Sequence, residues 1–109
     1  MRVAVGEPKL EGGDVPKARA AIEKLAKRLA ACADEHGGLA RDAARVRVQL
    51  LVRAAGIAEG VDVLEARGLS DDAKRCVRDA LQRKRIGTPS SDPVGLTVDL
   101  DFSAAPAQP

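Results

Sequence analysis

Aromatic residues are almost absent from this sequence: Phe102 is the only one among 109 residues, and there is no Trp or Tyr. Proteins that bind single-stranded nucleic acids stack the bases on aromatic side chains, and RNA-recognition sheets carry several of them. The formal net charge is only +2 at pH 7, whereas nucleic-acid-binding domains usually carry a concentrated basic footprint. Both shortages argue against nucleic acid as a partner.

Metal ligands and long apolar segments are also scarce. The chain has one His, two Cys and no Cys-x-x-Cys pattern, which is too few soft ligands for a structural zinc site. We therefore expect no metal and no cofactor. No stretch approaches the ~20 apolar residues of a membrane-spanning helix, and the first residues lack the apolar segment of a secretory signal. The chain is expected to be either cytosolic or part of a longer exported protein.

The length fits a single domain, which we assign to residues 1–102. Within it, residues 1–13 contain a short alternation at Val3 and Val5 before a Pro and two Gly, which predicts a short peripheral strand and a linker. Residues 103–109 are small, uncharged and contain proline, a composition typical of a flexible tail.

Two helices are predicted by apolar stripes with steps of three and four residues. The first begins at Asp14, a suitable N-cap, has Pro16 in its first turn and ends at Gly37. The second begins at Ser70, whose hydroxyl can cap it, and ends at Gly87. Each stripe includes one cysteine. The inward positions are Val15, Ala18, Ile22, Leu25, Leu29, Cys32 and His36 in the first helix, and Ala73, Cys76, Val77, Ala80 and Leu81 in the second.

Alternating apolar and polar residues predict three further strands. Residues 46–52 alternate cleanly, and a glycine-containing turn connects them to residues 61–66, so a hairpin is the simplest interpretation. In the second of these strands two valines compete with Leu64 and Ala66 for the inner face, which leaves its register open. The last strand, residues 94–102, alternates as regularly as the first.

The order of these elements predicts an α+β fold. Two helices would pack on one face of a three- to four-stranded antiparallel sheet, in the order β-α-β-β-α-β. A ferredoxin-like arrangement of the same elements is the alternative.

An arginine row on the first hairpin strand distinguishes these arrangements. Arg45, Arg47 and Arg53 face away from the core, because neighbouring residues on a strand point to opposite faces. If the last strand lies antiparallel beside this one, Asp99 and Asp101 stand across from the arginines and pair with them, which is our prediction. In the ferredoxin-like alternative the first and last strands are neighbours and the two charged rows separate. The three arginines would then be free to bind a small anion or nucleic acid in a cytosolic module.

The two cysteines leave two alternatives open. Helices packed on one face of a sheet would bring Cys32 and Cys76 together, and a disulfide would close a loop of about 45 residues and add roughly 4 kcal/mol. Otherwise both residues remain buried free thiols. Cys32 could also be a nucleophile with His36, one helical turn away, as its base. No residue can be assigned to orient the His, and no oxyanion hole is indicated, so we expect no enzyme activity and no catalytic residue.

Taken together, these elements resemble a TonB C-terminal-like domain, in particular the AgmX type found in envelope and gliding-motility proteins of myxobacteria. The similarity covers residues 14–102. It depends on a Cys near the end of the first helix (Leu29-Ala-Ala-Cys32), on the strand Val46-Arg-Val-Gln-Leu-Leu-Val52, on the helical segment Cys76-Val77-Arg78-Asp79-Ala80-Leu81 and on a final strand that ends in Phe102.

The resemblance implies a disulfide between Cys32 and Cys76, a periplasmic or otherwise extracytoplasmic location, and a non-enzymatic role in protein–protein interaction at the cell envelope. The expected partner is a protein or peptide, or a second copy of the chain in a homodimer, and this segment has no membrane span. The resemblance also implies that the partner adds a strand at an edge formed by the last strand. The residues of that edge are Leu96, Thr97, Val98, Asp99 and Leu100.

Overall fold

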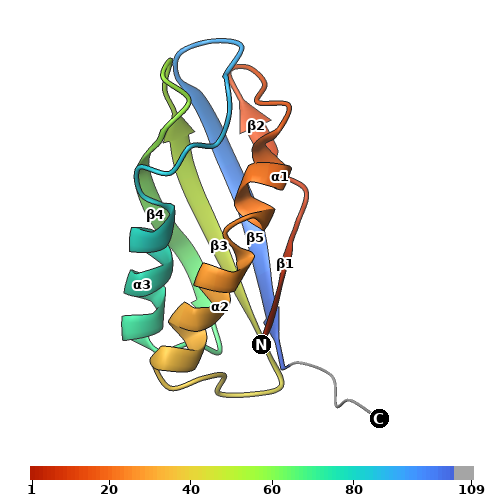
Figure 1. Ribbon diagram of the computed structural model, residues 1–109, viewed down its shortest axis with the longest axis vertical. Coiled ribbons are helices and arrows are strands. Elements are labelled where there is room, and N and C mark those ends of the chain that lie inside the picture. The colour runs from red at the N-terminus through yellow and green to blue at the C-terminus, as the bar shows by residue number, and fades with distance from the viewer. Residues whose placement is uncertain (105–109) are drawn as a thin grey trace.

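Five strands and three helices make up the computed structural model, which describes residues 1–104 (Figure 1). The strands form one antiparallel sheet, and the helices lie on one of its faces. The α+β class predicted from the sequence is therefore confirmed. No helix of the described residues is long and apolar enough to cross a membrane. The elements are β1 (Arg2–Val5), β2 (Lys9–Glu11), α1 (Ala18–Glu23), α2 (Ala26–Glu35), β3 (Ala43–Val52), β4 (Ala58–Arg67), α3 (Asp71–Leu81) and β5 (Val94–Ser103).

β5 lies inside the sheet and not at its edge. The strand order is β1-β5-β3-β4, and β2 also pairs with β5. The predicted partner-binding edge is therefore wrong: the short peripheral strand expected within residues 1–13 is present as β1, but both β1 and β2 pair with β5 and cover that side of it. The residues that this correction concerns are Leu96, Thr97, Val98, Asp99 and Leu100.

The other side of β5 pairs with β3 over the full length of both strands, from Ala43 opposite Ser103 to Val52 opposite Val94. Both strands alternate buried and more exposed residues, so one face of the pair packs under the helices. The ferredoxin-like alternative is wrong, because it separates two strands that are neighbours here. β5 also continues to Ser103, the first residue of the predicted tail; residues 105–109 lie outside the described part of the chain.

The predicted first helix is divided into α1 and α2. The amide of Leu25 donates to the carbonyl of Ile22 at 2.9 Å, a tighter turn than in an α-helix, and the division falls there. Asp14 is not the N-cap, because α1 begins four residues later at Ala18, and the backbone of Asp14 instead exchanges hydrogen bonds with Ser90. The predicted apolar stripe survives the division: Ala18, Ile22, Leu29 and Cys32 are buried.

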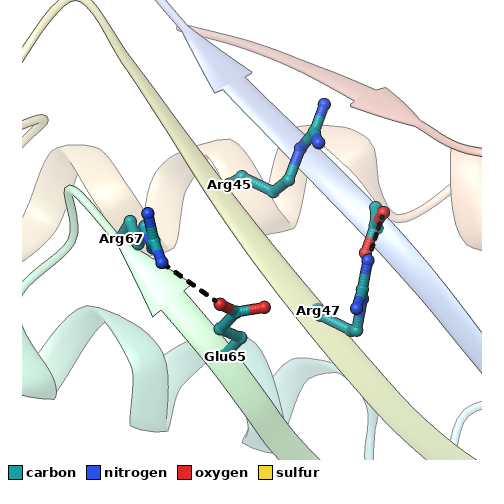
Figure 2. Close-up of a pocket in the computed structure, with 5 residues that line it drawn as sticks. Arg45, Arg47, Glu65 and Arg67 are labelled. Carbon is teal, nitrogen blue, oxygen red and sulfur yellow. Dashed lines mark hydrogen bonds and ion pairs between the residues drawn. The ribbon is translucent and has the colours of Figure 1, made fainter.

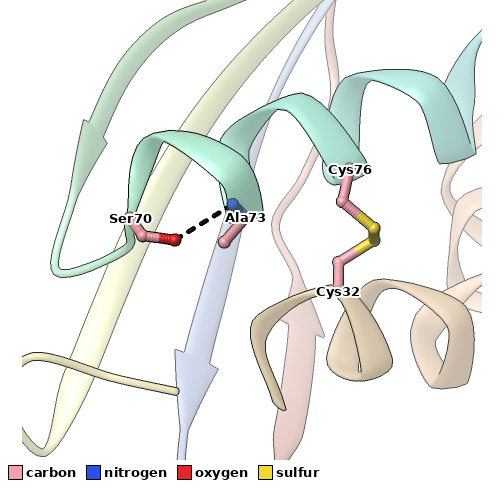
Figure 3. The surroundings of a disulfide bond; sticks show 4 residues. All are labelled: Cys32, Ser70, Ala73 and Cys76. Atoms are coloured by element: carbon pink, nitrogen blue, oxygen red, sulfur yellow. Dashed lines mark hydrogen bonds between the residues drawn. A yellow bond between two sulfur atoms is a disulfide. The ribbon is translucent and has the colours of Figure 1, made fainter. Parts of the chain in front are cut away.

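α3 begins as predicted but ends early. The Ser70 hydroxyl accepts a hydrogen bond from the amide of Ala73 at 3.1 Å, which caps the helix (Figure 3). The helix ends at Leu81 and not at Gly87, because the next residues turn away and Arg83 adopts a left-handed φ of 64°. The amide of Arg83 then donates to the carbonyl of Ala58 at 2.9 Å. The residues after Leu81 therefore hydrogen-bond to β4 and do not continue the helix.

A bulge explains why the register of β4 was ambiguous. Val63 stands opposite Val48 and Glu65 opposite Arg47, so Leu64 is an extra residue in the ladder. A second irregularity lies near Gly60, whose φ is +57°. With Leu64 displaced outward, Val61, Val63 and Ala66 all turn toward the helices. The two valines and Ala66 therefore share the inner face without conflict.

Candidate functional site

The exposed face of the sheet carries the predicted charge pairs. Nε of Arg45 lies 2.7 Å from Oδ1 of Asp101, and Nε of Arg47 lies 2.8 Å from Oδ1 of Asp99. A second guanidinium nitrogen of Arg47 donates to Oδ2 of Asp99 at 3.3 Å. These two pairs confirm the prediction. Arg53 differs, because its Nε contacts Asp92 at 2.8 Å, in the loop before β5.

The Arg47–Asp99 pair changes the proton affinity of both groups. The hydrogen bond from Arg47 lowers the pKa of the Asp99 carboxyl, against a smaller opposing effect of burial. The same hydrogen bond raises the pKa of Arg47, and a hydrogen bond with Asp101 raises that of Arg45. The Asp99 carboxylate thus stays ionised over a wider pH range and remains available to neutralise Arg47.

The hollow on this face contains charges of both signs. It has a volume of about 200 Å³ and is lined by Arg45, Arg47, Arg67, Glu65 and Asp99 (Figure 2). Arg67 and Glu65 also form an ion pair (Figure 2). Nη2 of Arg67 lies 3.5 Å from Oε1 of Glu65. An anion entering this hollow would have to displace carboxylates of the same chain. The arginine row therefore has an intramolecular explanation: it aligns β3 with β5.

A disulfide joins α2 to α3. Figure 3 shows the sulfur of Cys32 bonded to that of Cys76, with the two Cα atoms 5.4 Å apart. The disulfide alternative is thus the observed one. The disulfide also removes the free thiol that a Cys32 nucleophile would need, so the alternative of a Cys32 nucleophile with His36 as its base, which the sequence did not favour, is wrong. His36 ends α2, and its carbonyl accepts a hydrogen bond from the Ser70 hydroxyl at 2.7 Å.

The outer edge of β4 is covered over only half its length. The amide of Ala58 donates to the carbonyl of Lys84 at 2.8 Å, and the amide of Val61 donates to Oε1 of Gln82 at 3.1 Å. Residues 62–67 have no backbone hydrogen bond beyond those to β3 within the described chain. This half of β4 is the open edge of the sheet, and we call residues 62–67 the open segment.

A groove of about 450 Å³ runs between the open segment and α3. One wall is formed by residues 62–66, and the facing wall carries Asp71, Lys74, Arg75 and Arg78 from α3, with Lys74 paired to Asp71 at 2.8 Å. The bulge residue Leu64 is 52% exposed here, and it is one of two large hydrophobic side chains exposed in the described chain. Main-chain groups, an apolar side chain and charged side chains of both signs thus lie together.

The open segment was not identified as a site from the sequence. The sequence feature that could have indicated it is the ambiguous alternation at residues 61–66. A bulge adds one residue to a strand and so interrupts the regular alternation of its side chains. Where the open segment begins depends on α3 ending early, because residues 82–84 then cover the first half of β4. No periodicity in the sequence marks that end.

Comparisons with protein-family models, with curated proteins and with solved structures found no significant match. The function proposed below is therefore supported by the geometry of the chain itself.

Proposed function

We propose that this chain is a non-enzymatic protein-interaction domain that binds an extended segment of a partner protein as an added strand beside the open segment. The observation that carries the proposal is the unpaired half-edge of β4 lying against a groove walled by α3. An edge strand offers a row of main-chain donors and acceptors, and a neighbouring helix offers side-chain contacts that select the sequence.

The bulges of β4 limit how a strand can be added. They interrupt the ladder near Gly60 and at Leu64, and bulges of this kind protect edges from indiscriminate pairing. A partner strand is therefore expected to pair over a short stretch, with an apolar side chain against Leu64. Binding of this kind is selective for one segment and does not lead to open-ended aggregation.

The disulfide supports an oxidising compartment. Disulfides persist in secreted, periplasmic and cell-surface proteins and are rare in the cytosol of most organisms. The Cys32–Cys76 bond thus favours an extracytoplasmic domain at the cell envelope. This agrees with the resemblance to TonB C-terminal-like domains of myxobacterial envelope proteins, although the proposed strand is β4 and not the last strand.

The test is selection of binding peptides from a random phage-displayed library, followed by NMR mapping on the protein. The proposal expects shifts concentrated in residues 62–67 and on the facing wall of α3. Leu64→Asp should weaken the selected peptide about tenfold, since a charge replaces the apolar contact. Leu51→Asp is the matched control, because Leu51 is the other large exposed hydrophobic side chain and lies on β3.

Two results would contradict the proposal. One is a selected peptide that perturbs only other surfaces and binds equally to Leu64→Asp and Leu51→Asp. The other is a failure to select any peptide. A second copy of the chain could add its strand at the same edge. Sedimentation velocity over a range of concentrations tests for such a dimer. A dimer that is lost in Leu64→Asp would show that the partner is a second copy.

A further inference from the structure

A second groove lies away from the open segment, between α1 and the residues that follow α3. Residues 82–87 pass between α3 and α1 on the helical side of the sheet (Figure 1). The groove that they form with α1 has a volume of about 410 Å³ and shares no residue with the groove beside β4.

The rim of this groove is basic without compensation. Lys17 and Lys24 lie on the α1 side, Lys84 and Arg85 lie on the other side, and no acidic residue lines the groove. None of the four forms an ion pair within residues 1–104. Arg45, Arg47 and Arg53 all form one. Within residues 1–104, four cations without an ion pair thus surround one groove, whereas the arginine row is paired with carboxylates.

The floor of the groove is apolar. It consists of Ile86, which is 1% exposed, the half-buried Ala21 and Leu25, and the exposed Ala20. The amide of Ile86 donates to the carbonyl of Gly56 at 2.8 Å, which holds the floor in place.

The groove is narrow at the end where Gly87 approaches Val15. Gly87 has a φ of +140°, and a Cβ added there would lie 3.3 Å from Cγ1 of Val15. The approach of this segment to the start of α1 therefore requires glycine. Four cations around a recessed apolar floor require a ligand with carboxylates on either side of a hydrophobic group.

We propose that this groove binds an acidic peptide segment of a partner protein, with one aliphatic side chain on the floor and flanking carboxylates on the four cations. A concave floor accepts a protruding side chain. A bilayer is the less suitable occupant, because surface binding to membranes uses apolar side chains that project outward. Here Ile86 is buried, and the large exposed hydrophobic side chains lie elsewhere, on β3 and β4.

The probe for the test is a short fluorescein-labelled peptide with a single leucine between two runs of glutamate. Fluorescence anisotropy should show binding that weakens with salt, since exposed charges are screened. It should be lost when the glutamates are replaced by glutamine and weakened when the leucine is replaced by serine. Amide NMR shifts should be centred on Leu25 and Ile86.

The decisive variant is Lys24→Glu/Lys84→Glu, which reverses one charge on each side of the groove. We expect affinity for the probe to fall at least about tenfold. The matched control is Arg2→Glu/Lys9→Glu, which changes the net charge equally at two exposed cations that also lack an ion pair within the described chain. Circular dichroism checks that both variants remain folded.

Three results would overturn this inference. The first is equal loss of binding in both double variants, which would show a nonspecific charge effect. The second is absence of binding, or shifts that map to residues 62–67. The third is binding to anionic phospholipid vesicles that is lost in Lys24→Glu/Lys84→Glu while the peptide does not bind, which would make the occupant a membrane. Shifts that map to residues 62–67 would support peptide addition at β4, and the other results do not bear on that proposal.

Discussion

The two edges of the sheet end in different ways. At one edge, β1 and β2 form a broken strand, separated by residues 6–8, which include Gly6 and Pro8. Pro8 has no amide hydrogen, and short interrupted strands with charged residues are a poor template for further pairing. At the other edge, β4 is a ten-residue strand whose second half has no outer partner in the described chain. We call the interrupted edge of β1 and β2 the closed edge and the second half of β4 the open edge, at which the proposal places the added strand.

The helices extend this difference to the covered face. α2 packs beside β1, α3 packs beside β4, and the disulfide connects the two helices. The covalent bond thus joins the helix at the closed edge to the helix that walls the groove at the open edge. The predictions below test this division, beginning with the largest expected effect.

Removal of the disulfide should produce the largest loss of stability. For the 44-residue separation of Cys32 and Cys76, the loop-entropy relation gives about 4 kcal/mol. In a domain of this size Cys32→Ser/Cys76→Ser should lower Tm by more than about 10 °C in calorimetry. The wild-type chain in reductant is the control and should match the variant. An unchanged Tm in both samples would show that the helices are held by packing alone.

Truncation of an apolar side chain should matter at the closed edge and not at the open one. Val5 is 5% exposed and pairs with Leu100 in β5, so Val5→Ala should cost about 2 kcal/mol of unfolding free energy. Leu64 is 52% exposed, so Leu64→Ala should change stability by less than about 0.5 kcal/mol. Urea denaturation measures both. A larger loss for Leu64→Ala would mean that the open edge is structurally required.

The smallest effect is expected between the two edges, where Arg47 pairs with Asp99. Because folding lowers the pKa of Asp99, its contribution to stability is present above the ordinary carboxyl pKa and is lost as the pH falls through the lowered value. Asp99→Asn should therefore lower Tm slightly at neutral pH, by at most a few degrees, since the pair is partly exposed. The difference should disappear in acid. A difference independent of pH would assign the effect to packing.

The regular strands were predictable because their apolar and polar side chains alternate in the sequence as the buried and exposed positions alternate in the structure. β3 and β5 alternate without interruption, so pairing of the arginine row with Asp99 and Asp101 followed once the two strands were assumed to be neighbours. The start of α3 was equally clear, because a hydroxyl at Ser70 caps it locally. These features are determined by residues near one another in sequence or by a repeating pattern.

The edges were not predictable, because they depend on contacts between distant segments. A short peripheral strand was expected within residues 1–13, but neither its pairing with β5 nor the second short strand, β2, was. The early end of α3 depends on the contact of Arg83 with Ala58. The basic groove was missed for the same reason: Lys24 and Lys84 are far apart in sequence, and neither shows locally that it lacks an acidic neighbour.

Amide hydrogen exchange, measured by NMR without and with a library-selected peptide, tests the central claim most directly. In the free protein, amides of β5 should exchange slowly, whereas outward amides in residues 62–67 should exchange fast. When the peptide binds, protection should rise in residues 62–67 while β5 remains unchanged. Slow exchange throughout residues 62–67 in the free protein, or new protection at β1 and β2 only, would contradict the account.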